Sequence, residues 1–507
     1  MASYLNKFSI LLLLGLYIPI LFLGIFDLDE GAFASSSLQM LRDNQYLIPY
    51  LGDDLRLEKP IFTYWVQAFS MTLFGATEFA LRIPSIIASL IWGISFASFV
   101  RKHDNKISKT SIFLNLLTLP GVFIISFAAT ADAFLNLFIT LALINLFDYS
   151  QKPSNRNILK VSFYIALGFL TKGLTIIAIC GPVIFLFLLM QSKLKVFFKM
   201  LLNWRPWILF LILVAPWLYL VSQQIEEVDL SYLFLGQTFG RFTQTFENHT
   251  GPFYYYLLVL PILILPYLFD FLRGVRNLQI RANQLDSFML IWFLFVLIFF
   301  SFSSTKLPHY VLYGISPVAY VVTKQHLRDR NISVSLSFWL FSIIIWVFLS
   351  VLPQILSYLN EVKINYEVSD IVLHDFSSDV VFVSVCFVMA LFSSYYFFAK
   401  KSSNNLKRAT AIAMVGLISI KILPYVHDAS QGDIKKLGLQ AREFEEPISM
   451  YKLNKPSFSF YAQKNSLRGL ESSELIFTRT DKIKYLELEY EVISTSGNYM
   501  ILRLKND

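Results

Sequence analysis

Apolar runs long enough to cross a bilayer recur along most of this chain and constrain its fold more than any other feature. A membrane-spanning helix needs about 20 mostly apolar residues, and such runs recur from Leu11 to about residue 424. Of the 507 residues, 15% are charged, whereas soluble domains carry about 25%. The sequence therefore predicts an all-α polytopic membrane protein with thirteen spans. They cover residues 8–26, 80–99, 110–128, 131–148, 157–171, 173–190, 205–222, 253–272, 287–302, 308–323, 335–357, 379–398 and 408–424.

Lysine and arginine gather in alternate loops, which predicts the orientation of the chain. The basic loops include 101–109, 193–199, 273–281, 324–330 and 400–408, while the intervening loops hold acidic stretches such as 27–30. Cytoplasmic loops are the basic ones, so we expect a cytoplasmic N-terminus and an extracytoplasmic C-terminus. The same rule explains the net charge of +8 without nucleic acid. The first span is expected to be a retained helix, because no small-residue cleavage site follows it.

The composition changes near residue 425. Alternating apolar and polar residues in 485–492 and 499–504 are typical of strands with one buried face, and Ser496-Gly-Asn between them suits a tight turn. We therefore expect a transmembrane domain at 1–424 and a small extracytoplasmic α/β domain at 425–507. Both cysteines, Cys180 and Cys386, lie in apolar runs and offer no disulfide framework.

The first outer loop, 27–79, carries several candidate site residues. Asp29 and Glu30 follow the first span directly, and Glu58-Lys59-Pro60 comes later in the loop. The apolar patterns of 31–42 and 61–74 predict helices lying in the interface plane, which would hold these charges at headgroup depth. The alternatives are that Asp29 or Glu30 caps the helix near Gly31 and that Glu58-Lys59 is a surface ion pair.

Other candidate residues fall on the same predicted side of the membrane. Asp132 begins the fourth span, where a carboxylate is costly unless it is paired or faces water. The later outer loops add Arg241, His249, Lys306 and Tyr310. Arg241 and Lys306 are equally consistent with lysine or arginine side chains that reach the headgroups, and Asp132 with a helix cap. The outer histidines show no metal-ligand spacing.

Such a mixture of charges suits the transfer of a sugar from a lipid phosphate. The phosphate becomes more negative as the sugar leaves, and cations aimed at it stabilise that transition state. Lys59, Arg241 and Lys306 are the candidate cations, with Tyr310 as a hydrogen-bond donor. The attacking hydroxyl needs a carboxylate to accept its proton, for which Asp29 and Asp132 are the candidates and Glu30 and Glu58 give support.

These residues also resemble a known family. The chain is similar to the polyprenol-phosphate-dependent glycosyltransferases of the C-type fold, in particular the bacterial aminoarabinose transferases and protein mannosyltransferases. The matching pieces are Asp29-Glu30, Glu58-Lys59-Pro60, Phe74-Gly75 through Arg82-Ile-Pro84, Asp132, Thr171-Lys-Gly173, His249 with Pro252-Phe-Tyr-Tyr, and Lys306-Leu-Pro-His-Tyr310. They occur in the family's order over roughly residues 8–320, and each is short.

The resemblance implies an inverting transfer from an undecaprenyl-phosphate sugar at the periplasmic face of the bacterial inner membrane. It implies that Asp29 and Asp132 are essential, that Lys59 and Tyr310 contact the lipid phosphate, and that Glu58 and His249 share a cavity where some members hold a divalent metal ion. The chain reads Asp29-Glu-Gly-Ala-Phe33 where aminoarabinose transferases tend to read Asp-Glu-Thr-Arg-Tyr. That difference leaves the sugar undetermined.

The hypothesis is therefore a membrane glycosyltransferase with a polyprenyl-phosphate-linked sugar as donor and an envelope acceptor, either a lipid A-type lipid, a glycan or a protein. Its partners include membrane lipids and no nucleic acid. One alternative is a transporter or flippase of a lipid-linked sugar, which needs charged residues or broken helices along its path. Another is an envelope assembly protein whose outer domain binds partners.

Overall fold

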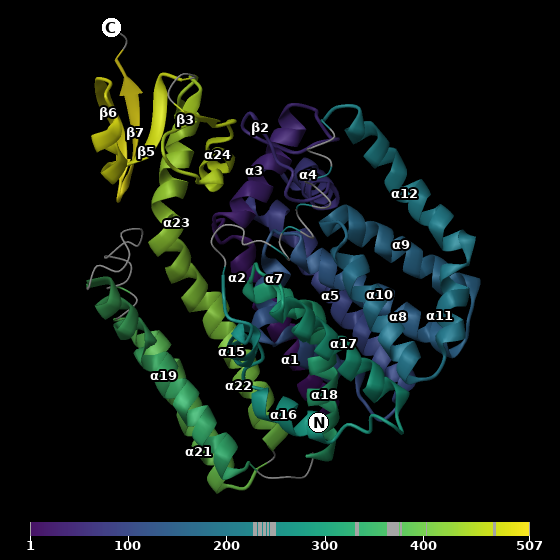
Figure 1. The fold of residues 1–507 in the computed structure, drawn as a ribbon. Helices are drawn as coiled ribbons and strands as arrows, with labels where there is room; N and C mark the ends of the chain where they lie inside the picture. The colour runs from purple at the N-terminus through teal and green to yellow at the C-terminus, as the bar shows by residue number, and fades with distance from the viewer. Residues whose placement is uncertain are drawn as a thin grey trace.

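A bundle of long helices forms most of the computed structural model, with a small sheet at one end (Figure 1). The structure describes residues 2–226, 250–329, 334–361, 378–401, 403–469 and 473–505, and the single positions 231, 236, 240, 243 and 375. The helices up to residue 222 are α1 (Ala2–Gly15), α2 (Ile18–Leu21), α3 (Asp29–Arg42), α4 (Phe62–Phe74), α5 (Glu78–His103), α6 (Lys109–Leu117), α7 (Pro120–Phe127), α8 (Asp132–Gln151), α9 (Asn155–Lys172), α10 (Thr175–Met190), α11 (Leu194–Leu201) and α12 (Trp204–Ser222).

The remaining described helices of the bundle lie between residues 255 and 443. They are α15 (Tyr255–Leu263), α16 (Leu268–Arg276), α17 (Gln284–Ser301), the 3-10 helix η2 (Pro308–Gly314), α18 (Ile315–Arg328), α19 (Leu336–Glu361), α21 (Val380–Phe398), α22 (Ser403–Leu417), the π-helical turn η3 (Ile418–Ile422), α23 (Leu423–Gln440) and the 3-10 helix η4 (Ala441–Glu443).

Seven helices in the described ranges are long and apolar enough to cross a membrane, and nine spans result if two bent helix pairs each count as one. Shorter apolar helices at Phe8–Leu21 and Thr175–Met190 add to these. The chain is therefore a multi-pass membrane protein, as predicted. Each predicted span overlaps at least one observed helix in sequence. Several of these helices are short or bent, so the count of thirteen spans stays a prediction.

The two bent pairs occupy ranges that the sequence predicted as single spans, 110–128 and 253–272. The helices α6 and α7 meet at 76°, and α15 and α16 meet at 113°. Proline explains both breaks, because it lacks the amide hydrogen that continues a helix. Pro120 is the first residue of α7, and Pro266 lies between α15 and α16. The break at 118–119 brings the chain toward Thr130 and Asp132, where the candidate site lies.

Two separate helices, α9 and α10, meet near Lys172, as the predicted spans 157–171 and 173–190 indicated. Gly173 follows α9 with a φ of +60°, a left-handed conformation that glycine adopts without a steric penalty. The short turn then allows α10 to start at Thr175. Lys172 is therefore the last residue of its helix, and its side chain is directed toward the start of α8.

The first outer loop folds into two helices close to the predicted ranges. Residues Glu30 to Met40 of α3 are all buried, because α3 packs between α4 and α24 (Pro456–Ala462). Thus α3 is enclosed by protein rather than lying free in the interface. By contrast, α4 exposes Phe69 and Leu73, which suits contact with lipid. A two-stranded hairpin, β1 (Tyr50–Leu51) and β2 (Asp54–Leu55), separates the two helices.

The C-terminal part forms a mixed five-stranded sheet in the order β4-β3-β5-β7-β6. The strands are β3 (Ile448–Met450), β4 (Leu467–Arg468), β5 (Leu475–Arg479), β6 (Tyr490–Ser496) and β7 (Tyr499–Leu504), with a 3-10 helix, η5 (Thr480–Tyr485), after β5. The first strand of the expected hairpin begins only at Tyr490, and Tyr485, the first residue of the expected range, is the last residue of η5. The boundary suggested at residue 425 falls inside a continuous helical run, Leu406–Glu443.

Hydrogen bonds attach this C-terminal unit to the first outer loop. The Asp27 carboxylate accepts from the Ser457 amide at 2.8 Å and from the Ser457 hydroxyl at 2.7 Å. The Ser35 hydroxyl donates to the Pro456 carbonyl at 2.6 Å, and the Tyr461 hydroxyl accepts from the Ile25 amide at 2.8 Å. These bonds place α24 beside α3 and the residues that precede it.

Candidate active site

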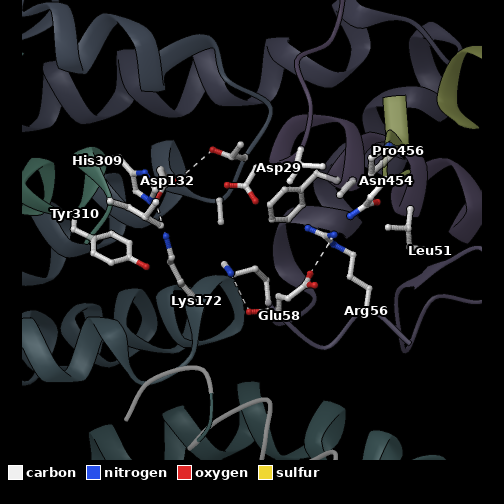
Figure 2. Close-up of a pocket in the computed structure, with 17 residues that line it drawn as sticks. Asp29, Leu51, Arg56, Glu58, Asp132, Lys172, His309, Tyr310, Asn454 and Pro456 are labelled. Atoms are coloured by element: carbon white, nitrogen blue, oxygen red, sulfur yellow. Dashed lines mark hydrogen bonds and ion pairs between the residues drawn. The ribbon is translucent and has the colours of Figure 1, made fainter. Parts of the chain in front are cut away.

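One cavity of about 120 Å³ contains most of the residues singled out in the sequence (Figure 2). Its walls come from the start of α3, the loop before α4, the start of α8, the end of α9, η2 and the segment before α24. The lining residues are Leu28, Asp29, Ala32, Phe33, Leu51, Arg56, Glu58, Lys59, Thr130, Ala131, Asp132, Lys172, Leu307, His309, Tyr310, Asn454 and Pro456. Segments more than 400 residues apart in sequence therefore enclose a single space.

Asp132 is held in place by partners from three other segments. Its Oδ1 atom accepts from the Lys172 ammonium and from the Tyr313 hydroxyl, each at 2.8 Å, and the Thr130 hydroxyl donates to Oδ2 at 3.3 Å. The His309 Nε2 atom lies 3.8 Å from Oδ1. A buried carboxylate needs such partners to stay ionised. Asp132 is thus a fixed anion that orients Lys172.

Asp29 presents its carboxylate differently. It is the first residue of α3 and is exposed to the cavity, and Figure 2 shows it between the Asp132–Lys172 pair and Arg56. Among the described residues, no hydrogen bond or ion pair engages this carboxylate. The alternative that Asp29 caps α3 finds no support, since no side-chain cap bond closes that helix. Asp29 is therefore placed to accept a proton from a ligand.

The cations of the cavity lie around it on different segments. The Arg56 guanidinium is 3.1 Å from the Glu58 carboxylate and donates to the Tyr64 hydroxyl at 2.8 Å. The Lys59 ammonium donates to the Glu58 carbonyl at 3.1 Å. Glu58 thus neutralises Arg56 and positions Lys59 through its backbone. Lys59 and Lys172, from different segments, both line this cavity and make it suited to an anion.

Glu30 is occupied by structural bonds. Both of its carboxylate oxygens accept from Arg82 at 2.8 Å, and they also accept from the Phe26 and Ala129 amides. Arg82 is fully buried and donates further to backbone carbonyls between Ile20 and Gly24. Glu30 therefore joins α3, α5 and the segment before α8, and it is absent from the lining of the 120 Å³ cavity.

The remaining predicted residues are divided between the cavity and other places. Tyr310 lines the cavity, with its ring 5.4 Å from the Lys172 ammonium. Lys306 is buried and donates to the Ser303 carbonyl, and it is absent from the lining. Arg241 and His249 lie outside the described residues.

The metal prediction rested on Glu58 and His249. Within the described ranges, no three His, Cys, Asp or Glu side chains form a group that could hold a metal ion. Glu58 is instead paired with Arg56. A metal ion bound with His249 stays a prediction.

Three basic residues of the cavity lining were not predicted as site residues: Arg56, Lys172 and His309. Lys172 had a usable signal, because the predicted spans place it on the outer side, where lysine is rare. A lone lysine between two apolar runs on the same side as Asp132 is a natural ion-pair partner. His309 sits next to Tyr310 in the quoted motif, but a single loop histidine has no distinctive pattern. Asn454 and Pro456 had no signal, since only the fold brings them there.

A larger cavity of about 1010 Å³ adjoins the first and shares Leu28, Asp29, Thr130, Leu307, His309 and Asn454 with it. The C-terminal unit contributes its cationic lining residues, Lys452, Lys455, Arg479 and Lys482. Asp27 also faces this cavity, and burial raises the pKa of its carboxyl from 3.8 to about 6, against the opposing effect of the Ser457 hydrogen bonds. The two cavities together form one space with acidic and basic walls.

Comparisons with known proteins show what this chain resembles. The family model described as dolichyl-phosphate-mannose-protein mannosyltransferase matches residues 58–220. An uncharacterised protein of Aquifex aeolicus is 29% identical over 60% of this chain and 70% of its own length. The undecaprenyl phosphate-alpha-4-amino-4-deoxy-L-arabinose arabinosyl transferase of Wigglesworthia glossinidia brevipalpis is 28% identical over 63% of this chain and 58% of its own length. The chain thus matches little more than half of that transferase.

A solved structure covers almost the whole chain. ArnT from Cupriavidus metallidurans bound to undecaprenyl phosphate superposes with a TM-score of 0.83 at 18% identity, over 99% of this chain and 98% of the other. The chain has the ArnT fold. Its apo form gives a TM-score of 0.82. The predicted resemblance to polyprenol-phosphate-dependent glycosyltransferases of the C-type fold is therefore confirmed.

Proposed function

We propose that this chain is a membrane glycosyltransferase that moves a sugar from a polyprenyl phosphate to an envelope acceptor with inversion at the anomeric carbon. One observation carries the proposal. Asp29, a carboxylate that no described residue engages, faces the same 120 Å³ cavity as Lys59 and Lys172. A base and cations that line one cavity are what a direct displacement of phosphate by a hydroxyl requires.

The cations would bind the phosphate of the donor. Lys59, Lys172 and the Tyr310 hydroxyl line the wall of the cavity formed by the loop before α4, the end of α9 and η2. Charge-assisted hydrogen bonds to phosphate are stronger than neutral ones, and they strengthen further as the phosphate gains charge. The ArnT whose fold this chain shares was solved bound to undecaprenyl phosphate, which supports a polyprenyl phosphate as the carrier here.

Asp29 would act as the general base. The acceptor oxygen attacks the anomeric carbon, and its proton passes to the Asp29 carboxylate. The bond from that carbon to the phosphate oxygen breaks, and its electron pair stays on the phosphate. Attack from the face opposite the leaving phosphate inverts the configuration. Asp132 would have a positioning role, since both of its oxygens already hold partners.

The larger cavity is the proposed entry for the acceptor. It opens on Asp29 and His309 and carries the cations Lys452, Lys455, Arg479 and Lys482 on its C-terminal wall. Anionic groups of an envelope lipid or glycan suit such a wall. The proposed acceptors are a lipid A-type lipid, a glycan or a protein. The sugar is left open, because the chain departs from the aminoarabinose transferase pattern at Gly31-Ala-Phe33.

The proposal also includes the arrangement of the chain in the membrane. Thirteen spans would place the N-terminus in the cytoplasm and the C-terminal unit, residues 425–507, in the periplasm of a bacterial inner membrane. The basic loops at 101–109 and 324–330 and the acidic stretch at 27–30 support this orientation. The candidate site then faces the periplasm, where polyprenyl-phosphate sugars and envelope acceptors meet.

The proposal is tested by supplying purified protein with polyprenyl-phosphate-linked sugars and an envelope lipid extract, and by measuring released polyprenyl phosphate with mass spectrometry. We expect release by the wild type and a loss of roughly 10²- to 10⁴-fold for Asp29→Asn, with donor binding retained. Asp53→Asn is the matched control, because Asp53 is an exposed carboxylate in the same loop outside the cavity. Equal turnover of Asp29→Asn and Asp53→Asn would refute the base. Donor moved across vesicles with its sugar intact would favour the flippase alternative.

A further inference from the structure

A second cavity, of about 630 Å³, lies far from the candidate active site and is lined by three segments, two of which contribute basic side chains. Its lining residues are Lys102, His103, Asp104, Asn105, Lys106, Gln279, Asn283, Lys324, Leu327 and Arg328. They come from the end of α5 and the residues after it, the segment between α16 and α17, and the end of α18.

The cavity is at the opposite end of the helix bundle from Asp29. Asp132 begins α8, and Asp148, near the other end of that helix, lies 2.7 Å from Lys102 and from His103. Sixteen residues of helix between Asp132 and Asp148 correspond to about 24 Å, most of the thickness of a hydrocarbon core. The C-terminal sheet and α3 lie at one end of the molecule, and α16 and α18 at the other (Figure 1).

Carboxylates fix two of its cations, and two others are exposed to the cavity. The Lys324 ammonium lies 2.6 Å from Asp286, which is fully buried. Lys102 has its partner in Asp148. Within the described ranges, no ion pair engages the Lys106 ammonium or the Arg328 guanidinium, and both residues are exposed. The two paired cations shape the wall. Lys106 and Arg328 together outweigh the single carboxylate of the lining, Asp104, and leave the wall with a net positive charge.

An apolar side chain lines the same cavity. Leu327 is 37% exposed although it is a large hydrophobic residue, and it lies next to Arg328. A cationic wall beside an apolar contact, at the level where helices leave the bilayer, suits an amphiphile with an anionic head. Basic pockets between transmembrane helices bind phosphate-bearing lipid headgroups in this way, and the amides of Asn105 and Gln279 offer further hydrogen bonds.

We propose that this cavity binds the phosphate group of an anionic membrane lipid through Lys106 and Arg328. Its position separates it from the carrier lipid that the candidate active site would take. The proposal does not depend on glycosyl transfer, so its failure would leave the proposed function untouched.

The test uses the full chain purified in detergent, with phosphatidylglycerol, phosphatidylcholine or inorganic phosphate added. Binding is measured by native mass spectrometry and by the thermal unfolding midpoint. We expect phosphatidylglycerol to bind and to raise the midpoint, and phosphatidylcholine to do neither. The double variant Lys106→Gln with Arg328→Gln should bind phosphatidylglycerol roughly 30-fold more weakly, at about fivefold per cation.

The matched control is Lys195→Gln with Lys199→Gln, which removes the same charge from exposed lysines of α11. It should bind as the wild type does. If inorganic phosphate alone raises the midpoint and the Lys106 and Arg328 variant loses that effect, the cavity holds a free phosphate and the site stands without the lipid. Equal losses in the two double variants, or no preference for phosphatidylglycerol together with no effect of phosphate, would overturn the site.

Discussion

At the scale of single residues, two carboxylates define the chemistry of the cavity. Asp132 is bonded to protein partners, and Asp29 is available to a ligand. Asp132 is engaged by Lys172, Tyr313 and Thr130, whereas no described residue bonds to the Asp29 carboxylate. The two aspartates were indistinguishable as candidate bases in the sequence. The structure distinguishes their roles. A carboxylate that accepts no hydrogen bond can accept a proton from a ligand, whereas a carboxylate that already accepts several hydrogen bonds is better suited to be a fixed charge.

The Asp132–Lys172 pair supplies a residue-scale prediction. Both side chains are 11% exposed, so Lys172→Met leaves Asp132 without its cation and should cost about 3–5 kcal/mol of stability. The double variant Asp132→Asn with Lys172→Met removes both charges and should recover much of that stability. If the pair also orients a catalytic cation, sugar transfer should stay lost in the double variant. Thermal unfolding and the release assay separate the two effects, and recovered transfer would contradict the positioning role.

At the scale of elements, the close approach of α3 to α24 connects the C-terminal unit to the site. A Cβ atom added at Gly31 would lie 2.2 Å from the Asp27 carboxylate and 2.7 Å from the Ser457 backbone nitrogen. Backbone atoms cannot move aside as a flexible side chain does, so only glycine fits between the two helices. The departure from the aminoarabinose transferase pattern at this position therefore has a structural explanation.

A substitution at Gly31 tests this contact. Gly31→Ala should displace α24 and cost about 1–3 kcal/mol, the range for overpacking. Gly15→Ala is the control, because a Cβ atom there meets nothing within 4 Å. Limited proteolysis should then cut the Gly31→Ala variant faster between α23 and β3 than the wild type, and equal cleavage of both variants would argue against the contact.

The short helices also show which elements the sequence predicts well. The ranges of α3 and α4 follow from apolar spacing, and the divided helices α9 and α10 follow from Lys172-Gly173. The breaks at Pro120 and Pro266 were missed, because proline occurs inside other spans of this chain, such as Pro84 in α5, without breaking them. Whether a proline kinks or divides a helix depends on neighbours that satisfy the exposed carbonyls, and those neighbours belong to the fold.

At the scale of the whole molecule, the junction between the C-terminal unit and the first outer loop should be sensitive to pH. Burial raises the pKa of Asp27 from 3.8 to about 6, so the folded chain holds this proton more tightly than the unfolded chain. The contribution of Asp27 to stability is thus full below about pH 4 and is lost as the pH rises through about 6, at up to about 1.4 kcal/mol per pH unit.

This dependence is measured from the thermal unfolding midpoint between pH 4 and pH 7 for the wild type and for Asp27→Asn. The wild type should lose stability over that interval relative to the variant, whose amide does not titrate. Ser457→Ala is a useful companion, because it removes the hydroxyl that donates to the carboxylate and should raise the pKa of Asp27 further. Parallel curves for the wild type and Asp27→Asn would contradict the assignment.

The sequence by itself determined that the chain lies in a membrane, and it identified the candidate site residues. Long apolar runs dictate a multi-pass membrane protein, since only helices satisfy their backbone in lipid. Short motifs that share one predicted side, including Asp29, Glu58-Lys59, Asp132 and Tyr310, indicated the place and the kind of chemistry. The resemblance that they suggested is confirmed by the fold, while the catalytic role of each residue stays a prediction.

Only the tertiary structure decided which charged side chains are paired with other protein groups and which are directed into the cavity. Glu30 is bonded to Arg82, and Lys306 donates to a backbone carbonyl. In the sequence, both looked like candidate site residues in the same way as Asp29 and Lys59. The closing wall at Asn454 and Pro456 comes from a unit more than 400 residues after Asp29. A sequence records the identity and spacing of charges along the chain. Which charges form pairs depends on the distances between them in the folded protein, and these distances are set by helix packing.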